Sequence, residues 1–405
     1  MRPLNIALAA TLLLTSTALA QTAEIYSIRK PPGILHGWGS SLEPIPDLDG
    51  DGVMDLAIGV LNHGGGIVAS VHSGASGALL YLLDTPHVPL FFGDGIVSVA
   101  DQNGDGVREL VIVGSHSGDS NSPDGLFQVH SGLDGSLLHS FAPPAGLFLL
   151  AHSQSSLQAL ADIDGDGSED ILAHTGSVAG RSLTLFSSTT GQVLYSVTPT
   201  APSALLGRRV ARLSDHDGDG LNDFAVAITT SFHKTFEIRS TADGTLIASR
   251  EAKALLHLTG NLEPFLSVAD ADGDGLRDLV AGAVFAGFVG RFSSADGEHL
   301  GAWDCSARPI ECFGSRVIEV EDFTGDGLPD LLAIESLSFV PGSVRLFGLD
   351  PASGAVVFED SGLHFSAGYV SAESIVALPG VDPRGNPSFA VFEDSTGRVS
   401  VRRVK

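Results

Sequence analysis

The chain has few cysteines, few basic residues and no long apolar segment. It contains 22 basic residues against 48 acidic ones, which gives a formal net charge of -26. Nucleic acids and anionic membranes attract positive charge, so this balance argues against binding either of them through bulk charge. No run of about 20 apolar residues follows the N-terminal segment, so we expect no membrane span.

The two cysteines are Cys305 and Cys312. A zinc site would need more nitrogen or sulfur ligands than their segment provides. If the chain is exported, a loop-closing disulfide between them is favoured, and two free thiols are the alternative.

The N-terminus has the features of a secretory signal. Arg2 precedes an apolar stretch from Ile6 to Leu14, and the small residues Ala18 and Ala20 stand just before Gln21. We predict a signal peptide over residues 1–20, with an uncleaved anchor as the alternative. The mature protein, residues 21–405, is then expected outside the cytoplasm, either extracellular or periplasmic.

A nine-residue pattern, Asp-x-Asp-Gly-Asp-Gly-x-x-Asp, recurs six times at intervals of 52 to 61 residues and contains nearly half of the acidic residues. A degenerate seventh copy at 382–390 has lost most of its acidic side chains and leads into an apolar run. Repeats of this length are typical of stacked architectures. The six intact loops are residues 47–55, 101–109, 162–170, 215–223, 270–278 and 322–330.

Short apolar runs surround each loop and predict buried strands. A second pair of strands follows around a glycine turn, as in residues 67–81. Each unit thus supplies about four strands, and units that cannot bury both faces alone must stack, which indicates a β-propeller. The last unit ends after its third strand, so we expect residues 24–29 to complete it and to remove an exposed edge.

An aromatic residue or leucine followed by glycine precedes four of the loops, at Trp38, Phe92, Leu206 and Phe313. Together with the loops and the period, this pattern resembles the FG-GAP repeat of integrin α-chain heads, over residues 24–405. The Gly-Ala-Pro element of that family is mostly eroded, for instance to Gly282-Ala283-Val284. The resemblance implies an all-β, seven-bladed propeller of four-stranded antiparallel blades.

The loops have the chemistry of calcium sites. Calcium takes about six to eight oxygen ligands, and each loop offers side chains at positions 1, 3, 5 and 9 and a backbone carbonyl at position 7. Without a cation, adjacent carboxylates repel by roughly 1 to 4 kcal/mol per pair. The predicted ligands, for up to six Ca²⁺, are Asp47, Asp49, Asp51, Val53, Asp55; Asp101, Asn103, Asp105, Val107, Glu109; Asp162, Asp164, Asp166, Ser168, Asp170; Asp215, Asp217, Asp219, Leu221, Asp223; Asp270, Asp272, Asp274, Leu276, Asp278; Asp322, Thr324, Asp326, Leu328 and Asp330.

The six sites are not expected to be equal. Asn103 and Glu109 modify the second loop and Thr324 replaces a carboxylate in the sixth, so these two should bind more weakly. An EF-hand would need a bidentate Glu at position 12, where all six residues are apolar. Dockerin modules and thrombospondin type 3 repeats do not match the long strand-forming segments between loops. Asp-Gly turns without an ion are the remaining alternative.

No catalytic motif of a metalloprotease, serine hydrolase or dinucleotide-binding enzyme is present in the sequence. The resemblance implies a non-catalytic extracellular binding or adhesion module for a protein or glycan. The alternative is an extracellular enzyme such as a polysaccharide lyase, because some secreted lyases resemble calcium-loaded propellers. The sequence does not identify the partner or the oligomeric state.

Overall fold

The computed structural model describes residues 22–34, 37–61, 66–85, 92–114, 125–150, 157–177, 180–199, 205–229, 234–252, 255, 265–283, 288–304, 313–336, 344–360, 375–393 and 396–405. The predicted signal peptide and the Cys305–Cys312 disulfide lie outside these residues. No helix within the described part of the chain is long and apolar enough to cross a membrane.

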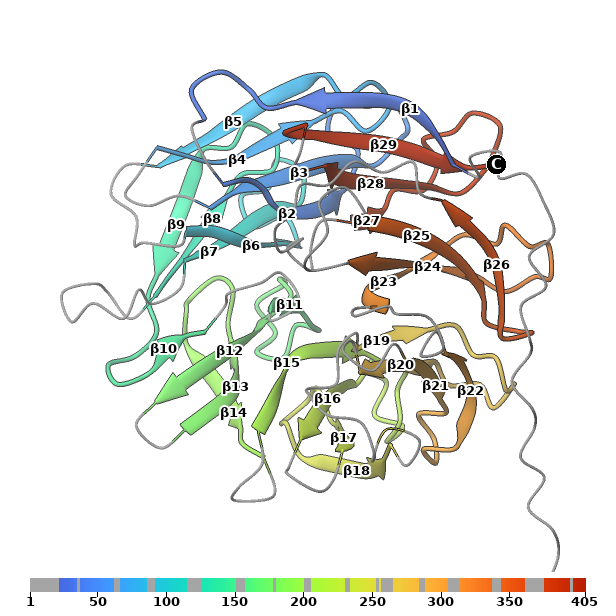
Figure 1. Ribbon diagram of the computed structural model, residues 1–405. Helices are drawn as coiled ribbons and strands as arrows, with labels where there is room; N and C mark the ends of the chain where they lie inside the picture. The colour runs from blue at the N-terminus through green and yellow to red at the C-terminus, as the bar shows by residue number, and fades with distance from the viewer. Residues whose placement is uncertain are drawn as a thin grey trace, which may run out of the picture.

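The described residues form an all-β ring of seven antiparallel sheets, which confirms the predicted fold class (Figure 1). In each blade the first strand borders the centre of the ring and the fourth lies at the outside. The first three blades comprise β2 (Trp38–Ile45), β3 (Asp55–Val60), β4 (Gly66–His72) and β5 (Leu79–Thr85); β6 (Phe92–Val99), β7 (Glu109–Gly114), β8 (Leu126–His130) and β9 (Leu137–Phe141); and β10 (Phe148–Leu149), β11 (Leu157–Ala159), β12 (Ile171–Ser177), β13 (Gly180–Phe186) and β14 (Val193–Val197).

The third blade differs from the others because two short segments, β10 and β11, both pair with β12. The remaining blades comprise β15 (Leu205–Arg212), β16 (Phe224–Thr229), β17 (Lys234–Arg239) and β18 (Leu246–Glu251); β19 (Phe265–Val268), β20 (Asp278–Ala283), β21 (Phe288–Phe292) and β22 (His299–Asp304); β23 (Phe313–Val320), β24 (Asp330–Ser336), β25 (Val344–Asp350) and β26 (Ala355–Asp360); and β27 (Ile375–Ala377), β28 (Ser388–Glu393), β29 (Arg398–Val404) and β1 (Thr22–Arg29).

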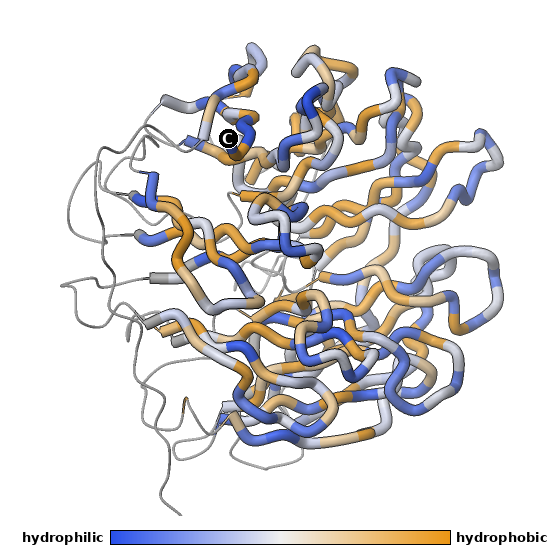
Figure 2. Tube along the Cα trace, turned by 90° about the vertical axis from the view of Figure 1, so that its right-hand side faces the viewer, coloured by the Kyte–Doolittle hydropathy of each residue, from blue (hydrophilic) through white to orange (hydrophobic). Residues whose placement is uncertain are grey.

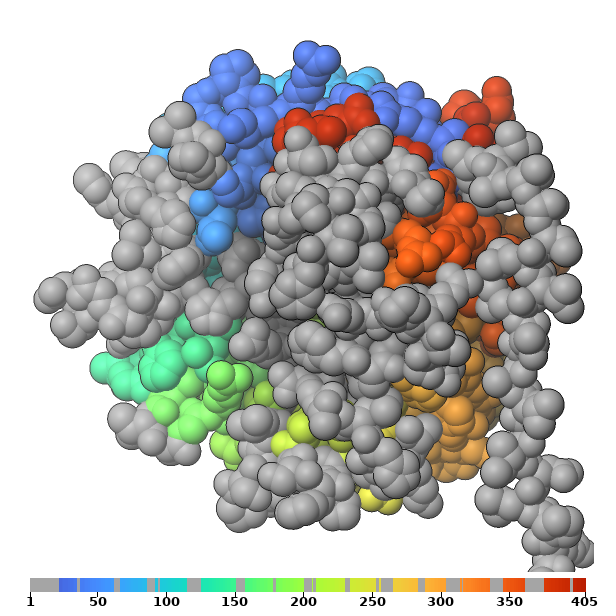
Figure 3. Space-filling model, in the orientation of Figure 1, coloured from blue at the N-terminus to red at the C-terminus, as the bar shows by residue number. Residues whose placement is uncertain are grey.

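The N-terminal strand β1 closes the seventh blade. It pairs antiparallel with β29, from Thr22 opposite Val404 to Arg29 opposite Arg398. Figure 3 shows the blue atoms of the N-terminal region against the red atoms of the C-terminal strand. Thr22 also reaches the sixth blade, where its backbone N–H donates to Asp360 Oδ2 at 3.0 Å. The predicted fourth strand of the last blade is thus present.

The core lies between blades rather than within them. Each of the seven buried hydrophobic clusters combines residues of two neighbouring blades; one of them packs Leu42 and Ile58 of the first blade against Ala390 and Val399 of the last. Figure 2 shows hydrophobic stretches along the strands and hydrophilic ones at many of the loops. A single blade therefore cannot bury its own faces, which is the physical basis of the repeat.

The glycine that follows the aromatic residue shapes the inner strands. Gly93 has φ +91° and lies where the pairing of β6 with β7 shifts register, between Phe92 and Gly95. A Cβ at Gly93 would lie 2.4 Å from the carbonyl oxygen of Val60 in the preceding blade. Glycine is needed there both for the backbone conformation and for the close approach of the blades.

Candidate metal loops

The six acidic loops occupy equivalent places in six blades. Each joins the innermost strand to the second strand; the first loop, for example, lies between Ile45 at the end of β2 and Asp55 at the start of β3. Because the innermost strands run in the same direction around the ring, all six loops lie at one end of it.

The carboxylate at position one organises the turn of each loop. In the first loop the N–H of Gly50 donates to Asp47 Oδ1 at 2.7 Å and that of Gly52 to Oδ2 at 2.8 Å. Both glycines have positive φ, at +78° and +86°. These backbone hydrogen bonds lower the pKa of Asp47. The same pair of bonds holds Asp101, Asp162, Asp215, Asp270 and Asp322.

The carboxylate at position nine stands at the start of the second strand or immediately before it, and it is buried in all six loops. Asp55 accepts the N–H of Leu48 at 2.7 Å and that of Gly74 at 2.9 Å. Burial raises the pKa of Asp55 to about 6, and it raises the pKa values of Asp170 and Asp278 to about 7. The charges of neighbouring loop aspartates contribute in the same direction. Of these three groups, Asp278 alone has a positive charge nearby that opposes the rise, that of Arg291.

Two of the position-nine carboxylates also have one oxygen without a hydrogen-bond partner. Oδ1 of Asp170 and Oδ1 of Asp278 are buried and have none. In three other loops the corresponding oxygen accepts a backbone N–H from the turn between the third and fourth strands. A buried polar atom without a partner is rare in folded proteins and costs about 1–3 kcal/mol. Asp170 belongs to a group of three carboxylates that could share a cation, whereas the group in the fifth loop comprises Asp270, Asp272 and Asp274.

Four loops gather three carboxylates whose oxygens lie within 4.8 Å of one another: Asp47, Asp49 and Asp55; Asp162, Asp164 and Asp170; Asp215, Asp217 and Asp223; and Asp270, Asp272 and Asp274. In each group the position-three aspartate is exposed at the mouth of the loop. These are the first, third, fourth and fifth loops, and each group could hold a metal ion.

The second and sixth loops are arranged differently. The amide of Asn103 donates to Asp105 Oδ2 at 2.8 Å, and the Thr324 hydroxyl lies 3.3 Å from Asp322 Oδ1 and 3.4 Å from Asp330 Oδ1. Both replacements thus place a neutral hydrogen-bonding group where the other loops have a carboxylate. A charged cation gains less from such a loop.

The seventh loop keeps one carboxylate and neutralises it. The N–H of Leu378 donates to the carbonyl of Ser388, as Leu213 does to Asp223, which aligns Ser388 with position nine. In this register Asp382 corresponds to position three, whereas the loop predicted at 382–390 places it at position one. Its Oδ1 lies 3.2 Å from Arg403 Nη1. A guanidinium group thus supplies the positive charge within the protein itself.

Serines in the turn between the third and fourth strands also support the loops, and they were not predicted from the sequence. The hydroxyl of Ser73, in the turn between β4 and β5, donates to Asp51 Oδ2 at 3.1 Å. Ser131, Ser187 and Ser293 make the same contact with position five of their loops, at 3.1, 3.3 and 3.5 Å. These serines recur 19 to 26 residues after position five in four of the loops, which is a signal that could have identified them. The backbone carbonyl ligands at position seven remain a prediction.

Three tyrosines, likewise not predicted from the sequence, connect this turn to the neighbouring blade. The hydroxyl of Tyr81, on the outer strand β5, donates to the carbonyl of Gly132 at 2.5 Å, and the N–H of Gly132 donates to Glu109 Oε2 at 3.1 Å. Tyr26 and Tyr195 make the equivalent contacts with the turns beside Asp55 and Asp223. The buried carboxylate of a loop is thus coupled through one turn residue to the adjacent blade.

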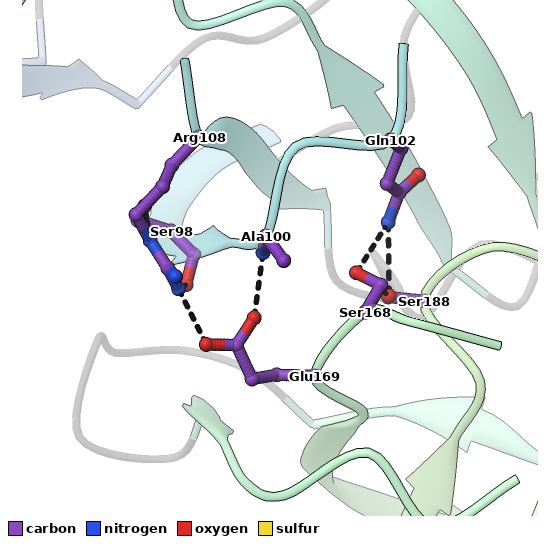
Figure 4. A network of polar contacts seen from close by, with 7 residues as sticks. All are labelled: Ser98, Ala100, Gln102, Arg108, Ser168, Glu169 and Ser188. Atoms are coloured by element: carbon purple, nitrogen blue, oxygen red, sulfur yellow. Dashed lines mark hydrogen bonds and ion pairs between the residues drawn. The ribbon is translucent and has the colours of Figure 1, made fainter. Parts of the chain in front are cut away.

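Side chains of neighbouring loops also contact each other directly (Figure 4). Arg108, at position eight of the second loop, pairs with Glu169 of the third at 2.8 Å. The amide of Gln102 donates to Ser168 Oγ and Ser188 Oγ, both at 2.9 Å. An ion pair and hydrogen bonds therefore connect the second loop to the third blade.

No protein-family model matches the chain. Its structure is similar to that of BBS1N, solved in complex with ARL6DN, with a TM-score of 0.58 and 10% identity over 96% of this chain and 98% of that one. It is also similar to Saccharomyces cerevisiae Sqt1, with a TM-score of 0.51 and 14% identity over 88% of this chain and 82% of that one. At these identities the likeness supports the β-propeller fold alone.

Proposed function

We propose that the six loops bind Ca²⁺ and that the protein is a secreted calcium-binding propeller that acts as a non-catalytic binding module. The observation that carries the calcium proposal is the pair of buried oxygens, Asp170 Oδ1 and Asp278 Oδ1, that have no partner in loops crowded with carboxylates. The resemblance to FG-GAP repeats supports the same assignment from the sequence.

Calcium fits these loops better than other common cations. The candidate ligands are all oxygen atoms, whereas zinc and copper prefer nitrogen and sulfur ligands. Magnesium demands near-ideal octahedral geometry and holds its water tightly, whereas calcium accepts irregular shells of about six to eight oxygens. A flexible loop with two glycines and four oxygen side chains suits calcium.

The calcium proposal is tested by thermal unfolding of the full chain in chelator, in Ca²⁺ and in Mg²⁺. A ligand that binds only the folded state stabilises it by about 2.7 kcal/mol per site at 100 times its dissociation constant. We expect Ca²⁺ to raise the melting temperature well above that in chelator, with a smaller effect of Mg²⁺. Equal melting temperatures in all three conditions would refute the proposal.

The proposed role as a binding or adhesion module for an extracellular protein or glycan rests on the fold and on the family resemblance. Propellers present large rims of loops on a rigid ring, and calcium would stiffen the loops at one end. A glycan array and a screen of extracellular proteins with calcium-loaded protein test this role. Calcium-dependent binding to a defined partner supports it.

The alternative, a polysaccharide lyase, needs a base beside an arginine. The described residues that line the central cavity include arginines but no tyrosine, histidine or lysine. Activity against acidic polysaccharides that chelation abolishes would overturn the non-catalytic role. Secretion itself is tested by locating the mature N-terminus of the exported protein, which we expect at Gln21.

A further inference from the structure

The seven innermost strands enclose a cavity of about 510 Å³ at the centre of the ring. Every blade contributes to it, and its lining consists mostly of the last few residues of each inner strand, before the acidic loop begins. Position eight of the second and third loops, Arg108 and Glu169, borders it as well. The volume lies within the range of about 300–1,000 Å³ that is usual for sites of small molecules.

The charges around this cavity are unusual for so acidic a protein. Four arginines and three glutamates line it: Arg108, Arg209, Arg212, Arg316, Glu43, Glu169 and Glu319. Two of the glutamates are neutralised by arginine, since Arg108 pairs with Glu169 at 2.8 Å and Arg277 with Glu319 at 3.0 Å. Positive charge therefore exceeds negative charge locally, although the whole chain carries -26.

Arg209, on β15, is the buried cation of this cavity. It is only 4% exposed and its Nε has no hydrogen-bond partner. No described carboxylate forms an ion pair with it. Arg212, three residues further along β15, is exposed and likewise has no ion-pair partner among the described residues. Burying a charge without a partner is costly, so such a group is retained where a ligand supplies the opposite charge.

The remaining walls combine apolar side chains with the polar side chains of Ser98, Gln158 and Ser267. Val97, Leu157, Val210 and Phe265 line the cavity beside the arginines. A guanidinium group matches the two oxygens of a carboxylate, and apolar walls favour a ligand with a hydrocarbon body over a bare inorganic anion.

We propose that the central cavity is a binding site for a small organic carboxylate, with Arg209 as its principal anchor and Arg212 as a second cation. This site goes beyond the proposed calcium function because it lies on the inner strands and uses none of the predicted calcium ligands. A carboxylate of about ten non-hydrogen atoms or fewer has the appropriate size and chemistry.

The test is isothermal titration of the calcium-loaded full chain with benzoate, with benzamide as the neutral isostere and sulfate as the bare anion. We expect benzoate to bind with a dissociation constant at or below about 1 mM, and benzamide and sulfate to bind at least tenfold more weakly. Equal binding of benzoate and benzamide would overturn the proposal. So would sulfate binding that equals or exceeds that of benzoate.

Variants separate a binding role of Arg209 from a structural one. Arg209→Leu should weaken benzoate binding by roughly 10- to 100-fold, the usual effect of losing a hydrogen bond to a charged group. It should also leave the melting temperature unchanged or higher, because an unpaired buried charge is removed. Arg181→Gln is the matched control, because Arg181 is exposed on β13 and its substitution changes the net charge by the same amount. It should change neither property.

A second variant keeps all charges and fills the space instead. Ala159 on β11 lines the cavity, so Ala159→Phe should abolish benzoate binding while both arginines remain. Unchanged benzoate affinity in both Arg209→Leu and a folded Ala159→Phe would refute the site. The calcium proposal is judged separately by the melting temperature in chelator, so either proposal can fail alone.

Discussion

At the scale of the residue, the position-nine carboxylates decide how the loops respond to metal. Asp170 and Asp278 each leave one buried oxygen without a donor, whereas Asp55 satisfies both of its oxygens through backbone N–H groups. Identical residues at identical repeat positions thus differ in how fully their buried oxygens are hydrogen-bonded. The difference comes from the turn in each blade that faces the carboxylate, not from the loop itself.

Asp170→Asn should change stability in opposite directions with and without calcium. In chelator the substitution removes an uncompensated buried charge, so we expect the free energy of unfolding to rise by about 1 kcal/mol or more. In calcium it removes a ligand, so the variant should be less stable than the wild type. Asp84→Asn, an exposed change on β5, should stay within about 0.5 kcal/mol under both conditions. Denaturant unfolding measures all four values; the same sign for Asp170→Asn in both media would contradict this prediction.

The same carboxylates predict a pH dependence of the metal-free protein. Their pKa is about 7 when folded and about 4 when unfolded, so between these values the folded chain binds more protons. Stability in chelator should therefore fall as pH rises from 4 to 7 through the contribution of these two groups. The double variant Asp170→Asn/Asp278→Asn isolates it: the difference in melting temperature between wild type and variant should grow toward pH 7. A constant difference would refute the predicted linkage.

At the scale of the element, the glycine of the inner strand controls how closely two blades approach. Gly93→Ala should cost about 3 kcal/mol or more, because its Cβ would lie 2.4 Å from the Val60 carbonyl oxygen in addition to the strain of positive φ. Gly354→Ala is the matched control: it has φ +71° but nothing within 4 Å of the new Cβ. It should cost only about 1 kcal/mol. Equal losses in urea unfolding would show that the approach of the blades is not limiting.

Strand β1 is the second element on which the ring depends. Deleting residues 21–30 removes the outer strand of the seventh blade and the contacts of Thr22 with Asp360 and Arg402. The edge of β29 would then be exposed, so we expect a sharply lower melting temperature and a tendency to associate through this edge. Calorimetry and light scattering measure both effects. An unchanged melting temperature would refute the prediction that the ring depends on β1.

At the scale of the whole molecule, the ring should bind calcium with unequal affinities. The first, third, fourth and fifth loops gather three carboxylates each, whereas Asn103 and Thr324 reduce the charge of the second and sixth. We expect native mass spectrometry during a calcium titration to show four ions bound before the last two. The seventh blade should bind none, since Arg403 already pairs with Asp382. Six indistinguishable sites would contradict this ranking.

Much of the architecture could be predicted because its determinants are local and repeated. The apolar run after each loop predicted a buried second strand, and Ile58, Ala173 and Ala333, at the position where an EF-hand needs Glu, are fully buried there. The missing fourth strand at the C-terminus predicted the role of β1. The loop residues were identifiable because carboxylates and glycines alternate within nine positions.

The sequence by itself determined the seven units, the strand order and the carboxylates that could meet a cation, because each of these depends on residues close together in the chain. Only the tertiary structure decided which of those carboxylates keep an unpartnered oxygen, where Tyr81 contacts the next blade, and how Arg209 comes to lie in a central cavity. These features arise where different blades meet. Residues from separate repeats have no shared local pattern, so packing of the closed ring alone brings them together.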